Sequence, residues 1–135
     1  MPSLLETASE LNKMLTTALT GVLPIAAENI PYTEAVGTDY VEVDFLPYTS
    51  VNVNIGAAST KRIRSEGVLN IIIRSGIGKG IGTAYGYIET IQTAMENKNP
   101  VANLFTYTAD VRRVGEGSDG WYTIIVDIPF ISDDI

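Results

Sequence analysis

Two carboxylates in the first half of the chain are the first candidates for chemistry. Glu42 and Asp44 are separated by one residue in the segment Tyr40–Pro47, where apolar and polar residues alternate. In an extended strand both side chains project from the same face, about 7 Å apart, which is compatible with a pair of acid–base carboxylates. No neighbouring residue in the sequence singles out either one as the acid or the base. We therefore interpret both as members of a solvated sheet face.

A glycine-rich turn is the second candidate, because backbone amides at such turns can bind anions. Its glycines are Gly76, Gly78, Gly80 and Gly82. A P-loop requires Gly-x-x-x-x-Gly-Lys and then Ser or Thr, but Gly80 follows Gly78-Lys79, and Ile73 stands where the first glycine should be. The dinucleotide spacing Gly-x-Gly-x-x-Gly is also missing. We predict a flexible turn between a strand and a closely packed helix, with an anion site as the alternative.

Basic residues gather at two places in an acidic chain. The two groups are Lys61, Arg62 and Arg64, and Arg112 and Arg113. One interpretation is an interface with an acidic partner surface. The other is a set of scattered surface salt bridges, each worth under about 1 kcal/mol. The sequence leaves both open, and it predicts that the acidic pair Asp133 and Asp134 is simply solvated.

Composition excludes several classes of function. The 135 residues contain no cysteine and no histidine, so disulfides, Cys/His zinc sites and imidazole catalysis are ruled out. With a formal net charge of -7, the chain is a poor candidate for tight binding of nucleic acid. Its longest apolar run, Ile71 to Ile73, is too short for a bilayer, and the start has no basic signal-peptide region. We expect a single domain over residues 1–135, made in a cytoplasm.

Periodicity predicts two helices and several strands. Apolar residues recur at helical spacing in Leu4–Leu19 and again at Ala84, Ile88, Ile91 and Met95. Strands are expected at Ile25–Glu28, Tyr40–Pro47, Ser50–Ile55, Arg62–Arg74, Leu104–Val114 and Trp121–Phe130, and a mobile hairpin loop at Gly56–Lys61. This order indicates an α+β fold with a mostly antiparallel sheet of five to six strands and two helices on one face.

The ordered set of segments resembles the lambda-type tail terminator family of long-tailed bacteriophages. The similar segments span nearly the whole chain: Leu4–Leu19, Ile25–Tyr32, Tyr40–Pro47, Asn54–Gly56, Glu66–Leu69, Gly76–Gly82, Trp121–Tyr122 and Ile128–Phe130. No single segment is a specific motif, so the resemblance depends on their order.

The resemblance implies a non-enzymatic virion protein that uses no cofactor. Such proteins form a homohexameric ring on the last ring of tail-tube protein, end tube polymerisation and offer a surface to the head through its head-completion or connector protein. DNA only passes through the central channel, and no membrane is involved. The expected location is the head–tail junction of the virion, with the host cytoplasm during assembly.

The resemblance also implies positions in the ring for the acidic and the basic candidate residues. Glu42 and Asp44 would face the lumen, and Lys61, Arg62, Arg64, Arg112 and Arg113 would contact partners. Two alternatives stay open: another neck or tail-tube component, and a small-ligand or anion-binding module that uses the turn Gly76–Gly82.

Overall fold

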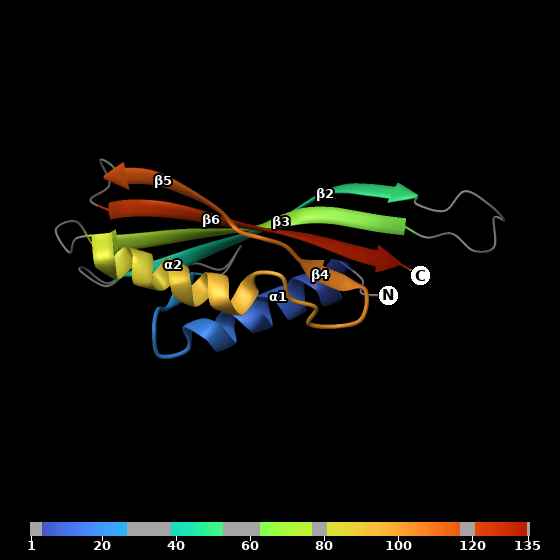
Figure 1. Ribbon diagram of the computed structural model, residues 1–135, viewed down its shortest axis with the longest axis horizontal. Helices are drawn as coiled ribbons and strands as arrows, with labels where there is room; N and C mark the ends of the chain where they lie inside the picture. The colour runs from blue at the N-terminus through green and yellow to red at the C-terminus, as the bar shows by residue number, and fades with distance from the viewer. Residues whose placement is uncertain (1–3, 27–38, 53–62, 77–80, 117–120, 135) are drawn as a thin grey trace.

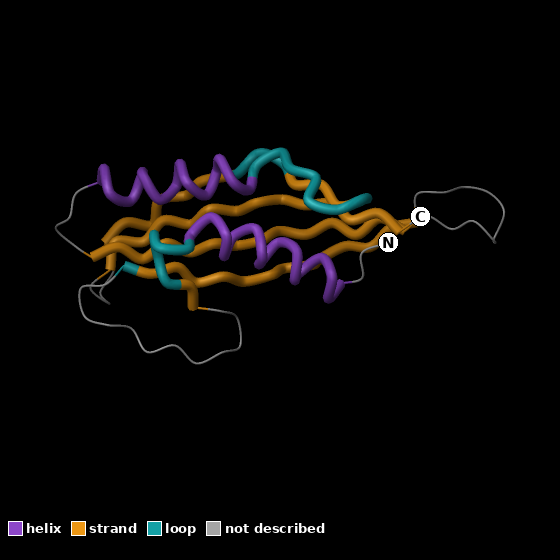
Figure 2. Tube along the Cα trace, turned by 90° about the horizontal axis from the view of Figure 1, so that it is seen from below, coloured by secondary structure: helices purple, strands orange, loops and turns teal. Residues whose placement is uncertain are grey.

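A computed structural model describes residues 4–26, 39–52, 63–76, 81–116 and 121–134 (Figure 1). In chain order its elements are α1 (Leu4–Leu19), β1 (Ile25–Ala26), β2 (Tyr40–Asn52), β3 (Ile63–Gly76), α2 (Ile81–Met95), β4 (Leu104–Thr106), β5 (Asp110–Glu116) and β6 (Trp121–Asp134). Both helices lie on the same face of the sheet (Figures 1 and 2). The fold is therefore α+β, as predicted.

The two helices bury the stripes that the sequence predicts. In α1, Leu11, Leu15 and Leu19 are at most 1% exposed, and the helix gives way to Gly21 with a left-handed φ of 76°. In α2, the buried residues are Ala84, Ile88, Ile91 and Met95. Because each stripe occupies one face of its helix, both helices can pack on the sheet and against each other.

The six strands form one sheet in the order β1-β2-β3-β6-β4, and β5 also pairs with β6. Only the short pair β1–β2 is parallel. β4 pairs with Phe130–Ser132 and β5 with 122–127, so these two strands share one edge of the long strand β6. The sheet therefore ends in β2 and β1 on one side and in β5 and β4 on the other.

The strand β2 is longer than predicted, because it continues through Pro47 and joins the two expected strands Tyr40–Pro47 and Ser50–Ile55 as far as Asn52. The register with β3 shifts between Pro47 and Thr49. The amide of Val41 points to the outer side of β2, where it donates to the carbonyl of Pro24 (3.0 Å). Pro47 is six residues further on, so its nitrogen faces the same outer side. Its missing N–H therefore removes no hydrogen bond to β3.

The predicted strand Leu104–Val114 is instead divided into β4 and β5. The hydroxyl of Thr106 accepts from the amide of Lys98 (2.8 Å), and the amide of Ala109 donates to Glu96 Oε1 (3.2 Å). These bonds hold the residues between β4 and β5 against the residues that follow α2. Nothing in the hydrophobic pattern marks such a division.

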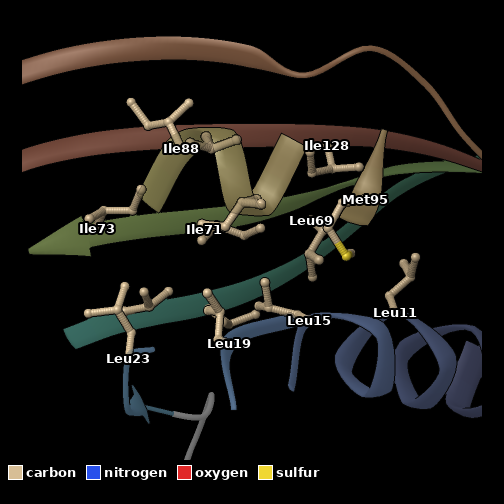
Figure 3. Close-up of a cluster of buried hydrophobic side chains, with 14 of the residues drawn as sticks. Leu11, Leu15, Leu19, Leu23, Leu69, Ile71, Ile73, Ile88, Met95 and Ile128 are labelled. Carbon is tan, nitrogen blue, oxygen red and sulfur yellow. The ribbon is translucent and has the colours of Figure 1, made fainter. Parts of the chain in front are cut away.

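The hydrophobic core fills the space between the helices and the sheet (Figure 3). β3 contributes Leu69, Ile71 and Ile73, all 0% exposed. The core is packed tightly at Gly67, where an added Cβ would lie 2.5 Å from Cζ of Phe130. The ring of Phe130 in turn stacks on the ring of Phe45, with 5.1 Å between the ring centroids.

Candidate functional site: the uncovered face and edges of the sheet

The face of the sheet opposite the helices is covered by no element that the structure describes (Figure 1). We call it the open face. Strand alternation places these charged residues on it: Glu42, Asp44, Glu66, Asp110, Asp127, Asp133, Arg64, Arg74 and Arg112. Six acidic against three basic residues give this face a net charge of -3. The open face is thus acidic, like the chain as a whole.

One row of polar residues crosses four strands of the open face. Asp44 lies opposite Asn70, Asn70 opposite Asp127, and Asp127 opposite Asp110. The side-chain amide of Asn70 donates to Asp127 Oδ1 (2.5 Å). The register thus gathers three carboxylates from three strands into one line. Sequence reasoning singled out only Asp44 of these, because the pairing of strands distant in the sequence is not visible in the pattern.

The three arginines of the open face all form ion pairs between neighbouring strands. The pairs are Arg64–Asp133 (2.8 Å), Arg74–Glu42 (3.2 Å) and Arg112–Asp127 (3.0 Å). They join β3 to β6, β2 to β3, and β5 to β6. The arginines therefore balance charge within the sheet, as the salt-bridge interpretation of the sequence proposed for Arg64 and Arg112.

The pair Arg64–Asp133 has the most regular geometry of the three. Nε of Arg64 donates to one carboxylate oxygen of Asp133 (2.8 Å) and an Nη donates to the other (3.1 Å). The hydrogen bond with Asp133, followed by the charge of that carboxylate, raises the pKa of Arg64. Asp133 is thus engaged in an ion pair, whereas the sequence predicted it to be simply solvated; the side chain of Asp134 lies outside the described part.

Glu42 and Asp44 share the open face, but their surroundings differ. Glu42 accepts hydrogen bonds from Arg74 (3.2 and 3.4 Å) and from the hydroxyl of Tyr40 (3.4 Å). Asp44 takes part in no ion pair that the described residues show. Tyr40, two residues before Glu42, is only 5% exposed, because its ring packs edge-on against that of Trp121, with 5.3 Å between the ring centroids. Asp44 therefore presents its charge more freely than Glu42.

The predicted basic groups do not form a common patch in the described part. Lys61 and Arg62 lie outside the described residues, as does the expected loop Gly56–Lys61. Arg64 is near the end of the sheet that holds Asp133, while Arg112 and Arg113 are on the edge strand β5. Arg113 is exposed and makes no ion pair among the residues that the structure describes.

Exposed apolar side chains gather at both edges of the sheet. Leu46 on β2 is 49% exposed. At the opposite margin, Phe105 is 40% and Tyr107 44% exposed, and Val111 and Val114 of β5 are 39% and 61% exposed. Five of the seven large apolar side chains that are exposed in the described part thus lie on β2 or along 105–114. Such a concentration is typical of an interaction surface.

The outer sides of both edge strands face few other strands in the described part of the sheet. Among the described strands, β1 pairs with β2 only at Val41 and Glu42, and no strand pairs with the outer side of β5. An edge strand that carries exposed apolar residues and unpaired backbone groups is a template for pairing with another chain. Sequence reasoning missed both edges, since edge position follows from topology.

A buried polar anchor lies at the end of β3, beside the glycine-rich turn. Asp39 is 4% exposed and accepts hydrogen bonds from the amide of Gly76 (2.9 Å), the hydroxyl of Tyr87 (2.8 Å) and that of Ser75 (3.4 Å). Burial, and then the hydrogen bond to Asp39, raise the pKa of Tyr87 to about 12. The anchor joins β2, β3 and α2, so we interpret it as structural. No pattern in the sequence singled out Asp39.

The glycine-rich turn gives little support to a ligand site. Gly78 and Gly80 lie outside the described residues, Gly76 ends β3 and Gly82 is in the first turn of α2. An added Cβ at Gly82 would meet nothing within 4 Å, so close helix packing does not require this glycine, contrary to expectation.

In the described part, no group of three or more acidic residues is arranged to hold a metal ion. Neither of the two helices there has the length and apolar character that a bilayer crossing requires.

Comparison with known proteins supports the fold alone. No protein-family model and no curated protein matches the chain. Among solved structures, one protein whose name indicates no function superposes with a TM-score of 0.63 over 93% of this chain and 94% of its own, at 16% sequence identity. The two chains therefore share a fold over nearly their full lengths.

Proposed function

We propose that this protein is a structural subunit of a long-tailed bacteriophage, which caps the tail tube as a ring. In this role it ends tube polymerisation and provides the surface to which the head attaches. The observation that supports the proposal best is the acidic open face on a sheet whose other face is occupied by the protein's own helices. The order of the sequence segments, which resembles that of the tail terminators, supports it independently.

The open face is suited to line a channel for DNA. A ring repeats every charge of one subunit around its axis, so Asp44 and Asp110 of the row become a belt of carboxylates, while Arg112 compensates the charge of Asp127 between them. Such a belt repels the phosphates of DNA and prevents the genome from adhering in transit. Asp44 is the main candidate for this role, because Arg74 already compensates the charge of Glu42.

Assembly of tubes in vitro tests the capping function. Tail-tube protein encoded by the same genome is allowed to polymerise with and without this protein, and the tubes are measured by electron microscopy. We expect elongation to stop, with the added protein labelled at one end of each tube. Label distributed along the tube would favour the alternative of a tube component. Unchanged elongation and no bound label, at a molar excess over tube ends, would contradict both roles.

The channel role is tested separately with Asp44→Lys, using Asp44→Asn as the matched control for loss of charge. Exposed substitutions usually change stability by less than about 1 kcal/mol, so tails should assemble to normal length. We expect slower genome ejection with Lys than with Asn, because the lysine attracts phosphates whereas the amide only ceases to repel them. Normal ejection from particles that carry Asp44→Lys would remove Asp44 from the channel.

A further inference from the structure

The open face is divided along its strands into an apolar part and a charged part. Two adjacent rows near the C-terminal end of β6 consist mainly of apolar side chains (Figure 1). The row beside them, toward the start of β6, is the acidic one that includes Asp127. The apolar members are Leu46, Val68 and Pro129 in one row and Ile131 and Phe105 in the next.

Tyr107 belongs to the same surface. Its amide donates to the carbonyl of Pro129 (2.9 Å), which places it at the end of the first apolar row. The hydrogen bond and the charge of Asp133 raise the pKa of Arg64, and Tyr107 adds to this rise, so its hydroxyl lies near that guanidinium. We call the following six residues the apolar patch: Leu46, Val68, Phe105, Tyr107, Pro129 and Ile131.

The apolar patch is open to solvent in the single chain. Leu46, Tyr107 and Phe105 are 40–49% exposed, and the three inner members are partly exposed. No described element covers them (Figure 1). Elsewhere on the open face, the partly exposed pair Ile72 and Ile125 lies between charged residues. A contiguous apolar surface of this kind marks a binding site.

Carboxylates surround the apolar patch. Glu66 of β3 lies in its second row, and Asp44 and Asp110 lie in the adjacent acidic row. None of these three residues forms an ion pair that the described residues show. The guanidinium of Arg64 is engaged by both oxygens of Asp133. The partner that fits this surface is therefore apolar and carries positive charge.

A second copy of the chain does not match this description. Two open faces brought together would oppose the same carboxylates, and each chain has a formal net charge of -7. The helices on the other face are acidic as well, because they carry Glu6, Glu10 and Glu89 against Lys13. The match is therefore with a different protein.

The place of the apolar patch in a ring follows from that of the acidic row. The row runs across the strands, so it closes into a belt around the channel only if the strands run roughly along the channel axis. The apolar patch then lies beside the belt along that axis, at one mouth of the ring.

We propose that the apolar patch binds a segment of the tail-tube protein in which apolar residues are accompanied by a lysine or an arginine. The inference rests on the proposed function and names the surface and the chemistry of the contact with the tube. The cation of the segment meets Glu66, and Asp44 and Asp110 stay in the belt that faces DNA. A cap that ends elongation has to hold the tube end against further tube subunits, and burial of apolar area supplies such affinity.

Substitutions of exposed residues test the contact. The double variant Leu46→Ser, Phe105→Ser removes two side chains of the patch, which are 49% and 40% exposed. The matched control is Val22→Ser, Tyr85→Ser, at two residues that are each 45% exposed and lie outside the open face. We expect sedimentation with tail tubes to show roughly tenfold weaker binding for the patch variant and unchanged binding for the control.

The charge of the partner is tested with Glu66→Lys. Its control is Glu89→Lys on α2, which changes the net charge equally at an exposed site away from the open face. We expect several-fold weaker binding to tubes for Glu66→Lys only, and a smaller difference between the two variants at high salt. If the double serine variant fails to fold, this pair decides.

The partner segment is identified by crosslinking to purified tail tubes. A photoreactive phenylalanine analogue replaces Phe105 in one preparation and Tyr85 in the control. We expect an adduct with the tail-tube protein from position 105 and not from position 85. Mass spectrometry of the adduct should locate a segment with apolar residues and a lysine or an arginine.

The outcomes separate this inference from the proposed function. Tubes capped equally well by the parent protein and by both patch variants keep the function and overturn the contact. A parent protein that caps no tubes removes the function and, with it, the tube as the partner. Loss of self-association by Leu46→Ser, Phe105→Ser in the absence of tubes would assign the patch to a contact between copies and overturn the inference. A crosslink from position 105 to the head-completion protein in place of the tube protein also overturns it.

Discussion

Successive residues of β3 alternate between the two faces of the sheet, and they show how differently the faces are built. Leu69, Ile71 and Ile73 are 0% exposed beneath the helices, while Asn70 and Arg74 on the open face bond to side chains of neighbouring strands. The covered face stabilises the fold by removing apolar area from water. The open face carries charge that is arranged by strand register and, in our proposal, lines the channel for DNA. Substitutions on the two faces should therefore separate stability from function.

The largest difference in the loss of folding stability is expected between substitutions of two adjacent isoleucines. Ile71→Ala, on the covered face, should lower the free energy of unfolding by about 2–5 kcal/mol, because it leaves a cavity in a fully buried site. Ile72→Ala, on the partly exposed open face, should lower it by only about 1 kcal/mol. Urea denaturation of both variants measures the difference. Equal losses would mean that the open face is covered in the folded monomer.

Gly67→Ala should lower stability by about 1–3 kcal/mol through overpacking. The new methyl group would lie 2.5 Å from Cζ of Phe130 and 2.8 Å from the carbonyl oxygen of Leu46. Gly82→Ala and Gly86→Ala in α2 are the controls, since a Cβ meets nothing within 4 Å at either site. In a helix this exchange favours folding by up to about 1 kcal/mol. Thermal unfolding should shift in opposite directions for the two groups; a common direction would contradict the packing described at Gly67.

Two tyrosine hydroxyls differ in whether they form a hydrogen bond in the described part. Tyr87→Phe should lower stability by about 1 kcal/mol, because Asp39 loses one of its hydrogen bonds. The hydroxyl of Tyr122 is buried and has no hydrogen-bond partner in the described part, so Tyr122→Phe should be neutral or stabilising. Chemical denaturation of both variants is the measurement. A larger loss for Tyr122→Phe than for Tyr87→Phe would show that the hydroxyl of Tyr122 is bonded in solution.

The smallest effect is expected for Glu42→Gln. The ion pair with Arg74 has partly exposed side chains on both sides, and such pairs contribute less than about 1 kcal/mol. Denaturation at low and at high salt should give nearly the same result for this variant and for the parent protein. A loss of several kcal/mol would mean that the open face carries stability as the covered face does.

The sequence predicted those parts of the molecule that depend on local periodicity. The stripes at Leu11, Leu15 and Leu19 and at Ile88, Ile91 and Met95 are buried as expected, because helical spacing determines which side chains share a face. Alternation in β2 correctly separated Val41 and Val43 from Glu42 and Asp44. The fold class follows from these elements and their order.

Features that depend on contacts between distant segments were not predictable. The row from Asp44 to Asp110 requires the order of four strands, and the anchor at Asp39 requires the approach of α2 to the end of β3. The strand β2 passes through Pro47 only because the proline nitrogen faces outward, which depends on register. The candidate site consists largely of such features. Its individual carboxylates were therefore predictable, and its arrangement was not.

The mass of the protein in solution, alone and with tail tubes, tests the central claim most directly. Light scattering over a range of concentrations should show association beyond the monomer, and addition of tubes should retain the protein as closed rings at tube ends. Both measurements are made on the same preparation, so that a ring whose contacts are completed only on the tube is also detected. A protein that stays strictly monomeric and neither caps nor sediments with tubes would contradict the account.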